Sequence, residues 1–214
     1  MGDGVSVNAM PKWPWGAVTT VFGVLMFLVT VVTLHLLQPG YDPVHQLISE
    51  LALGPYGWAM ILAFAGLALA AVGVQAALGV FGGSQYLRLL LTAAALFFLA
   101  AGVFPLGAHS EIHIAAIATA FVLSVLAMYF YPVGAGRAAN AVPRALSWCL
   151  AAGVAVGVAL GHSVLPMGIG QRLAALCLVI WLAILGWRFA NGRYAAQQPE
   201  VANTRPHGRS EKLT

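Results

Sequence analysis

Long apolar runs divide the chain into six blocks, separated by short stretches rich in polar residues, glycine and proline. The blocks cover residues 16–38, 56–80, 86–107, 112–132, 143–165 and 170–189. Each is close to the ~20 residues that an α-helix needs to cross a hydrocarbon layer of ~30 Å. The runs are continuous and do not alternate as the strands of a membrane barrel do. Because lipid leaves no partner for unpaired backbone groups, the pattern predicts an all-α membrane protein with a six-transmembrane-helix bundle.

The composition supports a membrane protein. Hydrophobic residues make up 61% of the 214 and charged residues 7%, whereas soluble domains carry about 25% charged residues. The mean hydropathy is +0.88. We therefore expect one transmembrane domain at 16–189, a cytoplasmic N-terminal segment at 1–15 and a disordered cytoplasmic tail at 190–214. The first apolar run is long enough to remain as a signal anchor.

Positive charges predict the orientation of the bundle. Nine of the ten Lys and Arg fall at the termini or in loops that belong to one side of the six predicted helices. The exception is Arg172, at the start of the last apolar block. Cytoplasmic loops are enriched in Lys and Arg, so both termini are expected in the cytoplasm of a cell with a plasma (inner) membrane. These charges are scattered singly, which argues against nucleic-acid binding.

The segment GYDPVHQLISELALGP at 40–55 is unusually polar for this chain. Asp42-Pro43 is a good helix start, since Asp caps and Pro fits the first turn, and Gly54-Pro55 is a good stop. We predict a short interfacial helix at 43–53 in the first extracytoplasmic loop. Its apolar face would consist of Val44, Leu47, Ile48 and Leu51.

On the predicted outer side, polar residues from several loops converge. Five of the six histidines lie there. The cluster expected to bind a substrate or to stabilise the fold consists of Tyr41, Asp42, His45, Ser49 and Arg172. Glu50 is the candidate catalytic base, and its alternative is a salt bridge with Arg172 or a bond to a histidine.

Histidines on this side could hold a metal. His109 and His113 are spaced i and i+4, which places two imidazoles on one helical face. His162, at the end of the fifth block, is the candidate third ligand, and Zn²⁺ is the metal such a set would bind. A structural hydrogen bond or simple exposure at the interface are the alternatives for these side chains.

Three classes of function remain open, and the sequence does not decide whether the protein is an enzyme. The first is a metal-dependent enzyme that acts on a lipid-like small molecule from the bilayer. The second is an electron-transfer protein with haem or copper held by His35 and either His113 or His162. The third is a non-enzymatic transporter, sensor or assembly factor.

Three motifs resemble the bacterial and archaeal membrane family named domain of unknown function 998. The first is the segment with Tyr41, Ser49, Glu50 and Leu51 after the first apolar block. The second is the Phe104-Pro105 turn followed by His109 and His113, and the third is the Gly-x-x-Gln-Arg-Leu run at 168–173. The resemblance covers 16–189. It implies the fold and the topology, since the family has no known activity.

Overall fold

A computed structural model describes residues 15–161 and 163–191, and within these ranges every regular element is helical. The all-helical prediction is confirmed. The α-helices are α1 (Trp15–Leu37), α2 (Met60–Val80), α3 (Gln85–Val103), α4 (Ser110–Gly134), α5 (Arg144–Leu160) and α6 (Met167–Asn191). Short 3-10 helices are η1 (Ile48–Leu53), η2 (Gly57–Ala59) and η3 (Gly136–Ala141).

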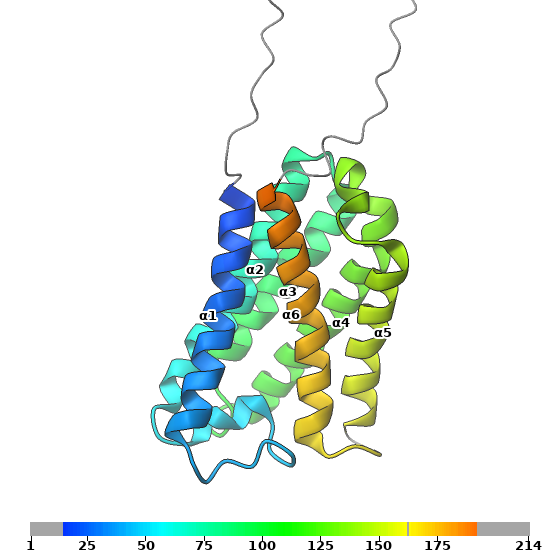
Figure 1. The fold of residues 1–214 in the computed structure, drawn as a ribbon. Helices are drawn as coiled ribbons and strands as arrows, with labels where there is room; N and C mark the ends of the chain where they lie inside the picture. Colours follow the sequence, from blue (N-terminus) through cyan, green and yellow to red (C-terminus); the bar gives the residue numbers. More distant parts are fainter. Residues whose placement is uncertain (1–14, 162, 192–214) are drawn as a thin grey trace, which may run out of the picture.

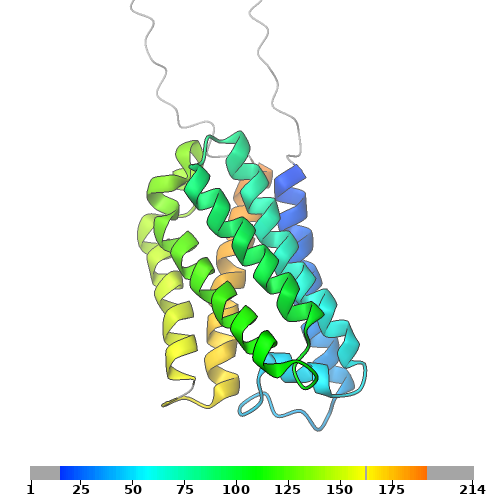
Figure 2. The same cartoon turned by 180° about the vertical axis from the view of Figure 1, so that it is seen from behind.

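The helices run alternately up and down, so that α1 begins and α6 ends at the same end of the bundle (Figure 1). Each helix packs against the next in sequence, and α6 returns to pack against α1. Seen from behind, α3 and α4 lie in front of the bundle (Figure 2). We call the opposite end, where α1, α3 and α5 finish, the cap end, and residues 38–55 the cap segment.

Five of these helices are long and apolar enough to cross a membrane, while α5 has 17 residues and is shorter. Their boundaries lie within a few residues of the apolar blocks. The predicted tail and N-terminal segment lie almost entirely outside the described residues. Large apolar side chains also face outward, including Phe22, Leu96 and Val122, which are 58%, 63% and 57% exposed. An apolar surface of this kind suits lipid and not water.

Glycines allow α1 and α2 to pack backbone to backbone. A Cβ added to Gly16 would lie 2.6 Å from the carbonyl oxygen of Gly73, and one added to Gly66 would lie 2.6 Å from that of Gly23. Small residues at such crossings let helices approach closely in lipid, where association depends on van der Waals contact. This contact fixes α1 against α2 along most of its length.

At the end opposite the cap, side chains bond to backbone carbonyls across helices. Ser147 donates its hydroxyl to the carbonyl of Met128 at 2.7 Å, and the Trp181 indole donates to Ser147 Oγ at 3.1 Å. Tyr131 donates to the carbonyl of Ala138 at 2.7 Å. These bonds join α4, η3, α5 and α6, and all three donor side chains are buried.

The predicted regular helix at 43–53 is wrong in its first half. Residues 43–46 form turns and a bend, and only Ile48–Leu53 is helical, with 3-10 geometry. Asp42 caps this turn instead of a helix, since its Oδ1 accepts from the Val44 N–H at 2.8 Å. The carbonyl of Gln46 accepts a hydrogen bond from Arg172 of α6, and the carbonyls of Pro43 and Val44 pack against Gly168 of the same helix.

We predict that Gly66→Ala lowers the free energy of unfolding by about 1–3 kcal/mol, because the new methyl group overpacks the contact with Gly23. The matched control is Gly79→Ala in the same helix, where the nearest atom to a new Cβ is 3.5 Å away, on Arg88. Ala has the higher helix propensity, so this control is expected to be neutral or stabilising. Thermal unfolding in detergent measures both; equal stability of the two variants would contradict the close packing.

Candidate functional site

Arg172, in the second turn of α6, holds the cap segment onto the bundle. Its Nη1 donates to the carbonyls of Gln46 at 2.9 Å and Gly168 at 3.0 Å. Its Nη2 donates to the hydroxyl of Tyr41 at 2.6 Å and to Nε2 of His35 at 3.0 Å. The guanidinium therefore joins α1, the cap segment and α6 through four hydrogen bonds to neutral acceptors.

The partners of His35 fix the form of its ring. Nδ1 lies 2.7 Å from the carbonyl of Val31, one turn earlier in α1, and must donate there. Nε2 is then a lone-pair acceptor for Arg172. Both ring nitrogens are thus engaged, which removes His35 as the axial haem or copper ligand expected from the sequence.

Tyr41 links Arg172 to the start of η1. Its hydroxyl accepts from Arg172 and donates to the carbonyl of Leu47 at 2.7 Å, while its ring lies 4.9 Å from that of His35, edge to face. Burial raises the pKa of Tyr41 above its ordinary value, and the hydrogen bond and charge of Arg172 oppose that rise. The phenol therefore stays protonated at neutral pH and keeps its donor.

The beginning of α6 is shaped to receive the cap segment. A Cβ on Gly168 would lie 2.5 Å from the carbonyl oxygens of Pro43 and Gln46, so no other residue leaves room for this backbone. Gln171, one position before Arg172, accepts a hydrogen bond from the Ile48 N–H through Oε1. These contacts explain why glycine, glutamine and arginine occur together in the run at 168–173.

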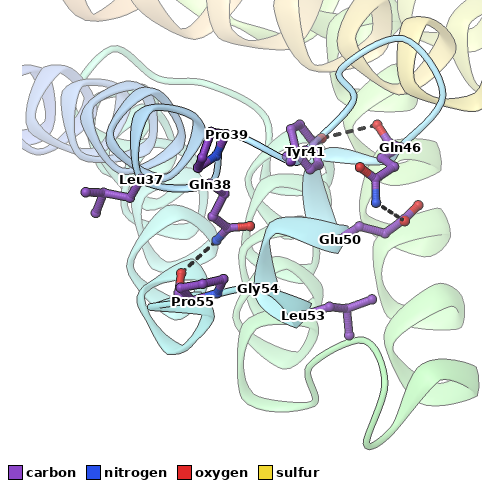
Figure 3. A pocket seen from close by; sticks show the side chains of 10 residues that line it. Leu37, Gln38, Pro39, Tyr41, Gln46, Glu50, Leu53, Gly54 and Pro55 are labelled. Carbon is purple, nitrogen blue, oxygen red and sulfur yellow. Dashed lines mark hydrogen bonds between the residues drawn. The ribbon is translucent and has the colours of Figure 1, made fainter.

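Gln38 anchors the other end of the cap segment. This side chain is 7% exposed, and its Nε2 donates to the carbonyls of Leu51 at 3.0 Å and Pro55 at 2.8 Å. Figure 3 shows the bond to Pro55 beside Gly54, where a Cβ would clash with the Gln38 amide. The segment is therefore tied at both ends.

Glu50 does not pair with Arg172 or with the histidines, so the predicted partners are wrong. Its Oε1 accepts from the Leu47 N–H at 2.9 Å, and its Oε2 from Gln46 Nε2 at 3.4 Å. Because η1 begins at Ile48, Glu50 falls at its third residue and caps its N-terminus. Across the described parts of the chain, the one ion pair joins His45 and Asp42.

The His45–Asp42 pair is exposed and lies at the tip of the turn. Nδ1 of His45 lies 2.7 Å from Oδ2 of Asp42. This hydrogen bond, with a second from the Val44 N–H, lowers the pKa of Asp42 below its ordinary value. The stability that the ionised Asp42 contributes is present at pH values above the ordinary pKa of Asp. It is lost as the pH falls through the lower pKa of the folded protein. Exposed pairs contribute little, so His45 and Asp42 shape the turn and do not contact Arg172.

A surface pocket of about 330 Å³ opens beside the cap segment (Figure 3). Gln46, Glu50 and Leu53 line one side of it, and Gln38 and Pro55 line the other (Figure 3). The Glu50 carboxylate is half-buried here. Each of its oxygens accepts one hydrogen bond, from the Leu47 N–H and from Gln46, and these bonds hold the carboxylate at the start of η1.

His113 is almost fully enclosed at the cap end of α4. Its side chain is 1% exposed, and Nδ1 lies 2.8 Å from the carbonyl of Ala101 and 3.1 Å from that of Phe104. The ring packs edge to face on Phe64 at 5.4 Å. Nε2 is buried and has no hydrogen-bond partner among the described residues. One nitrogen thus ties α4 to α3, and the other is free.

The other two histidines of the predicted metal set are not placed with His113. His109 precedes α4 as an exposed N-cap residue with non-helical dihedral angles, and its ring contacts Phe104 at 5.7 Å. The premise that both histidines share a helical face is therefore wrong. His162 lies outside the described residues. Within 15–161 and 163–191, no three His, Cys, Asp or Glu side chains group as metal ligands do.

His113 lines a cavity of about 140 Å³ beneath the cap segment, between α4, α5 and α6. Ser49 from η1 and Gln171 from α6 supply its other polar side chains, and Phe121 and Val158 belong to its apolar wall. The same two apolar residues also line a groove of about 240 Å³ between α4 and α5. The cavity and the groove thus lie side by side and share the wall formed by Phe121 and Val158.

The model of one protein family matches residues 21–188 of this chain, which is most of its length. The chain belongs to the DUF998 family. Its description is "Protein of unknown function". No curated protein and no solved structure matches this chain. Membership confirms the resemblance seen in the sequence, and two of the motif residues, Tyr41 and Arg172 of the run at 168–173, bond to each other.

Sequence reasoning missed Gln38, the free nitrogen of His113 and the groove. Gln38 could have been noticed as a polar residue at the end of an apolar block, directly before a proline. The groove has no signal in a single sequence, because it depends on how closely α4 and α5 pack. Ser49 was included in the polar cluster, and the structure places it in the cavity instead of beside Arg172.

We expect Arg172→Lys to release the cap segment, because an ammonium group cannot reproduce the planar fork that reaches His35, Tyr41 and two carbonyls. The expected loss of stability is about 3 kcal/mol, since hydrogen bonds to charged groups contribute about 1.5–3 kcal/mol each and Lys retains some of them. Hydrogen exchange should rise in 38–55 and stay unchanged in α2 and α3. Arg188→Lys in the same helix is the control. Unchanged hydrogen exchange in 38–55 of Arg172→Lys would show that Arg172 does not hold the cap segment.

Proposed function

We propose that this DUF998 protein crosses the plasma membrane six times with both termini in the cytoplasm, and binds a lipid-like molecule at its outer, cap end. The carrying observation is the cavity lined by His113, whose Nε2 is buried and unpaired among the described residues, beside an apolar groove between α4 and α5 that shares two of its wall residues. Ligand sites are mostly apolar concavities with a few polar groups, and this one has that composition.

The arrangement of the helices supports six crossings. Helix α5 is about 26 Å long at 1.5 Å per residue, a little short of the ~30 Å hydrocarbon core. It runs between α4 and α6, which point the same way in Figure 1, so the chain must return across the membrane through α5. The interfacial position of the cap segment follows, because it closes the end of such a bundle.

The charges support the orientation. Arg88 begins α3, Arg137 and Arg144 flank the start of α5, and Arg188 ends α6, all at the end opposite the cap. The cap end has Arg172 alone among the described cations, and that side chain is bound to the protein. The positive-inside rule then places the cap end outside.

A binding role is favoured over metal-dependent catalysis by the geometry of Glu50 and the histidines. Glu50 is used as a cap, His109 is exposed, and His113 reaches backbone carbonyls through one nitrogen. His113 Nε2 and the hydroxyl of Ser49 are suited to hydrogen-bond an uncharged polar group. Exchange of the ligand with the bilayer would occur sideways through the groove.

Cysteine labelling tests the orientation. In a background with Cys149 and Cys177 replaced by Ala, His45→Cys in the cap segment should react with a membrane-impermeant maleimide on intact cells. Arg137→Cys, at the opposite end, should react after the cells are lysed and not before. Labelling of position 45 only after lysis would overturn the proposed orientation.

Photolabelling tests the lipid site. A photoreactive, alkyne-bearing hexadecanol should label the full chain in nanodiscs, with crosslinks on α4 and α5. Ala155→Trp fills the groove and should reduce labelling about tenfold, the equivalent of ~1.4 kcal/mol. The control is Val156→Trp, at a residue that is 45% exposed and does not line the groove. Crosslinks spread evenly over all six helices, unaffected by Ala155→Trp, would show that no site exists.

A further inference from the structure

The free nitrogen of His113 is an acceptor. Since Nδ1 lies within hydrogen-bond distance of two carbonyls, it carries the proton, and Nε2 has a lone pair. A doubly protonated ring would be a buried cation, and no described residue that lines the cavity is an acid. Buried polar atoms in proteins are nearly always paired, so the occupant of the cavity should bring a donor.

The two other polar side chains of the cavity add a donor and a hydroxyl. Gln171 uses Oε1 to accept from Ile48, and no hydrogen bond of its amide nitrogen is recorded within the described residues. Ser49 is 2% exposed and faces the same space. None of the described lining residues is Lys or Arg. The guanidinium of the nearby Arg172 donates to four acceptors outside this group of side chains.

We infer that this cavity takes the hydroxyl head of a neutral, single-chain lipid, with the chain lying in the groove between α4 and α5. The inference rests on the proposed lipid-binding function and names the class of ligand. A hydroxyl group both donates and accepts, so it can donate to His113 and accept from Gln171 or Ser49.

Charge excludes the commoner heads. A phosphate or carboxylate would enter a chamber with no cation to pair with it and would face the lone pair of His113. A choline or ammonium head would lack an acid, because Glu50 lies outside this cavity and is used by Leu47 and Gln46. An uncharged hydroxyl avoids both costs.

The dimensions select one chain. The groove of about 240 Å³ has the room of about eight water-sized groups at ~30 Å³ each, which is enough for a stretch of one hydrocarbon chain and too little for two chains side by side. His113, Ile117, Phe121 and Val125 mark successive turns of α4 along the cavity and groove. At 1.5 Å per residue they span about 18 Å, more than half of the ~30 Å hydrocarbon core, so the chain would reach the middle of the bilayer.

Competition against the photoreactive hexadecanol tests the head group in the unmodified full-length protein. The competitors share one chain and differ in the head: hexadecanol, hexadecanoate, hexadecyl phosphate and hexadecane. Farnesol is added to compare an isoprenoid chain with a straight one. Hexadecanol should suppress labelling at concentrations at least tenfold lower than the acid, the phosphate or the alkane.

Two substitutions test the hydrogen bonds. His113→Phe keeps a ring in the same space and removes the acceptor, and Ser49→Ala removes one hydroxyl; each should weaken hexadecanol competition by about three- to tenfold. Hexadecane competition should not change, which separates loss of the head contact from loss of the groove. His109→Phe, at the exposed histidine, is the matched control and should behave as the unmodified protein.

The outcomes are distinguishable. If hexadecane or hexadecyl phosphate competes as well as hexadecanol, the head-group inference is wrong and lipid binding in the groove stands. If no competitor reduces labelling and Ala155→Trp has no effect, the proposed function itself is wrong and water fills the cavity. Because the competitor series uses the unmodified chain, a folding defect in His113→Phe does not prevent either conclusion.

Discussion

A half-buried guanidinium without an acid determines how the cap end is built. Arg172 bonds to two carbonyls, a phenol and an imidazole, and each of these acceptors must be held in place by something else. The carbonyl of Val31 orients the imidazole of His35, and the carbonyl of Leu47 accepts a hydrogen bond from the hydroxyl of Tyr41. Removal of the cation would leave several acceptors unpaired at once, so the cap segment, the end of α1 and the start of α6 depend on one side chain.

The bundle combines tight and loose interfaces. Glycines on α1 and α2, and Gly157 against α6 at Gly170, bring helix backbones into contact. Between α4 and α5 the contact is made by larger side chains, and a groove remains. In lipid no hydrophobic driving force closes such a gap. The closely packed α1 and α6 thus carry the polar network at the cap end, and the interface of α4 with α5 holds the groove.

The fold was predictable because the thickness of the hydrocarbon layer fixes the length of each apolar run. The region of the site was predictable too, since Tyr41, Glu50 and Arg172 stood out in an apolar chain. Their partners were not. Reasoning from charge paired Arg172 with Glu50, whereas the guanidinium bonds to two backbone carbonyls, a phenol and an imidazole. A sequence carries no mark of which carbonyls are free. His113 could be singled out as polar, but its unpaired nitrogen follows from how α3 and α4 meet.

The neutrality of the acceptors around Arg172 has a consequence for how the cap end responds to salt. Dissolved salt screens the attraction between exposed charges beyond about 8–10 Å, and weakens ion pairs that hold loops together. A cation held by carbonyl, hydroxyl and imidazole dipoles at 2.6–3.0 Å offers almost nothing for ions to screen. The cap segment of this protein therefore keeps its position at high and at low salt concentration alike.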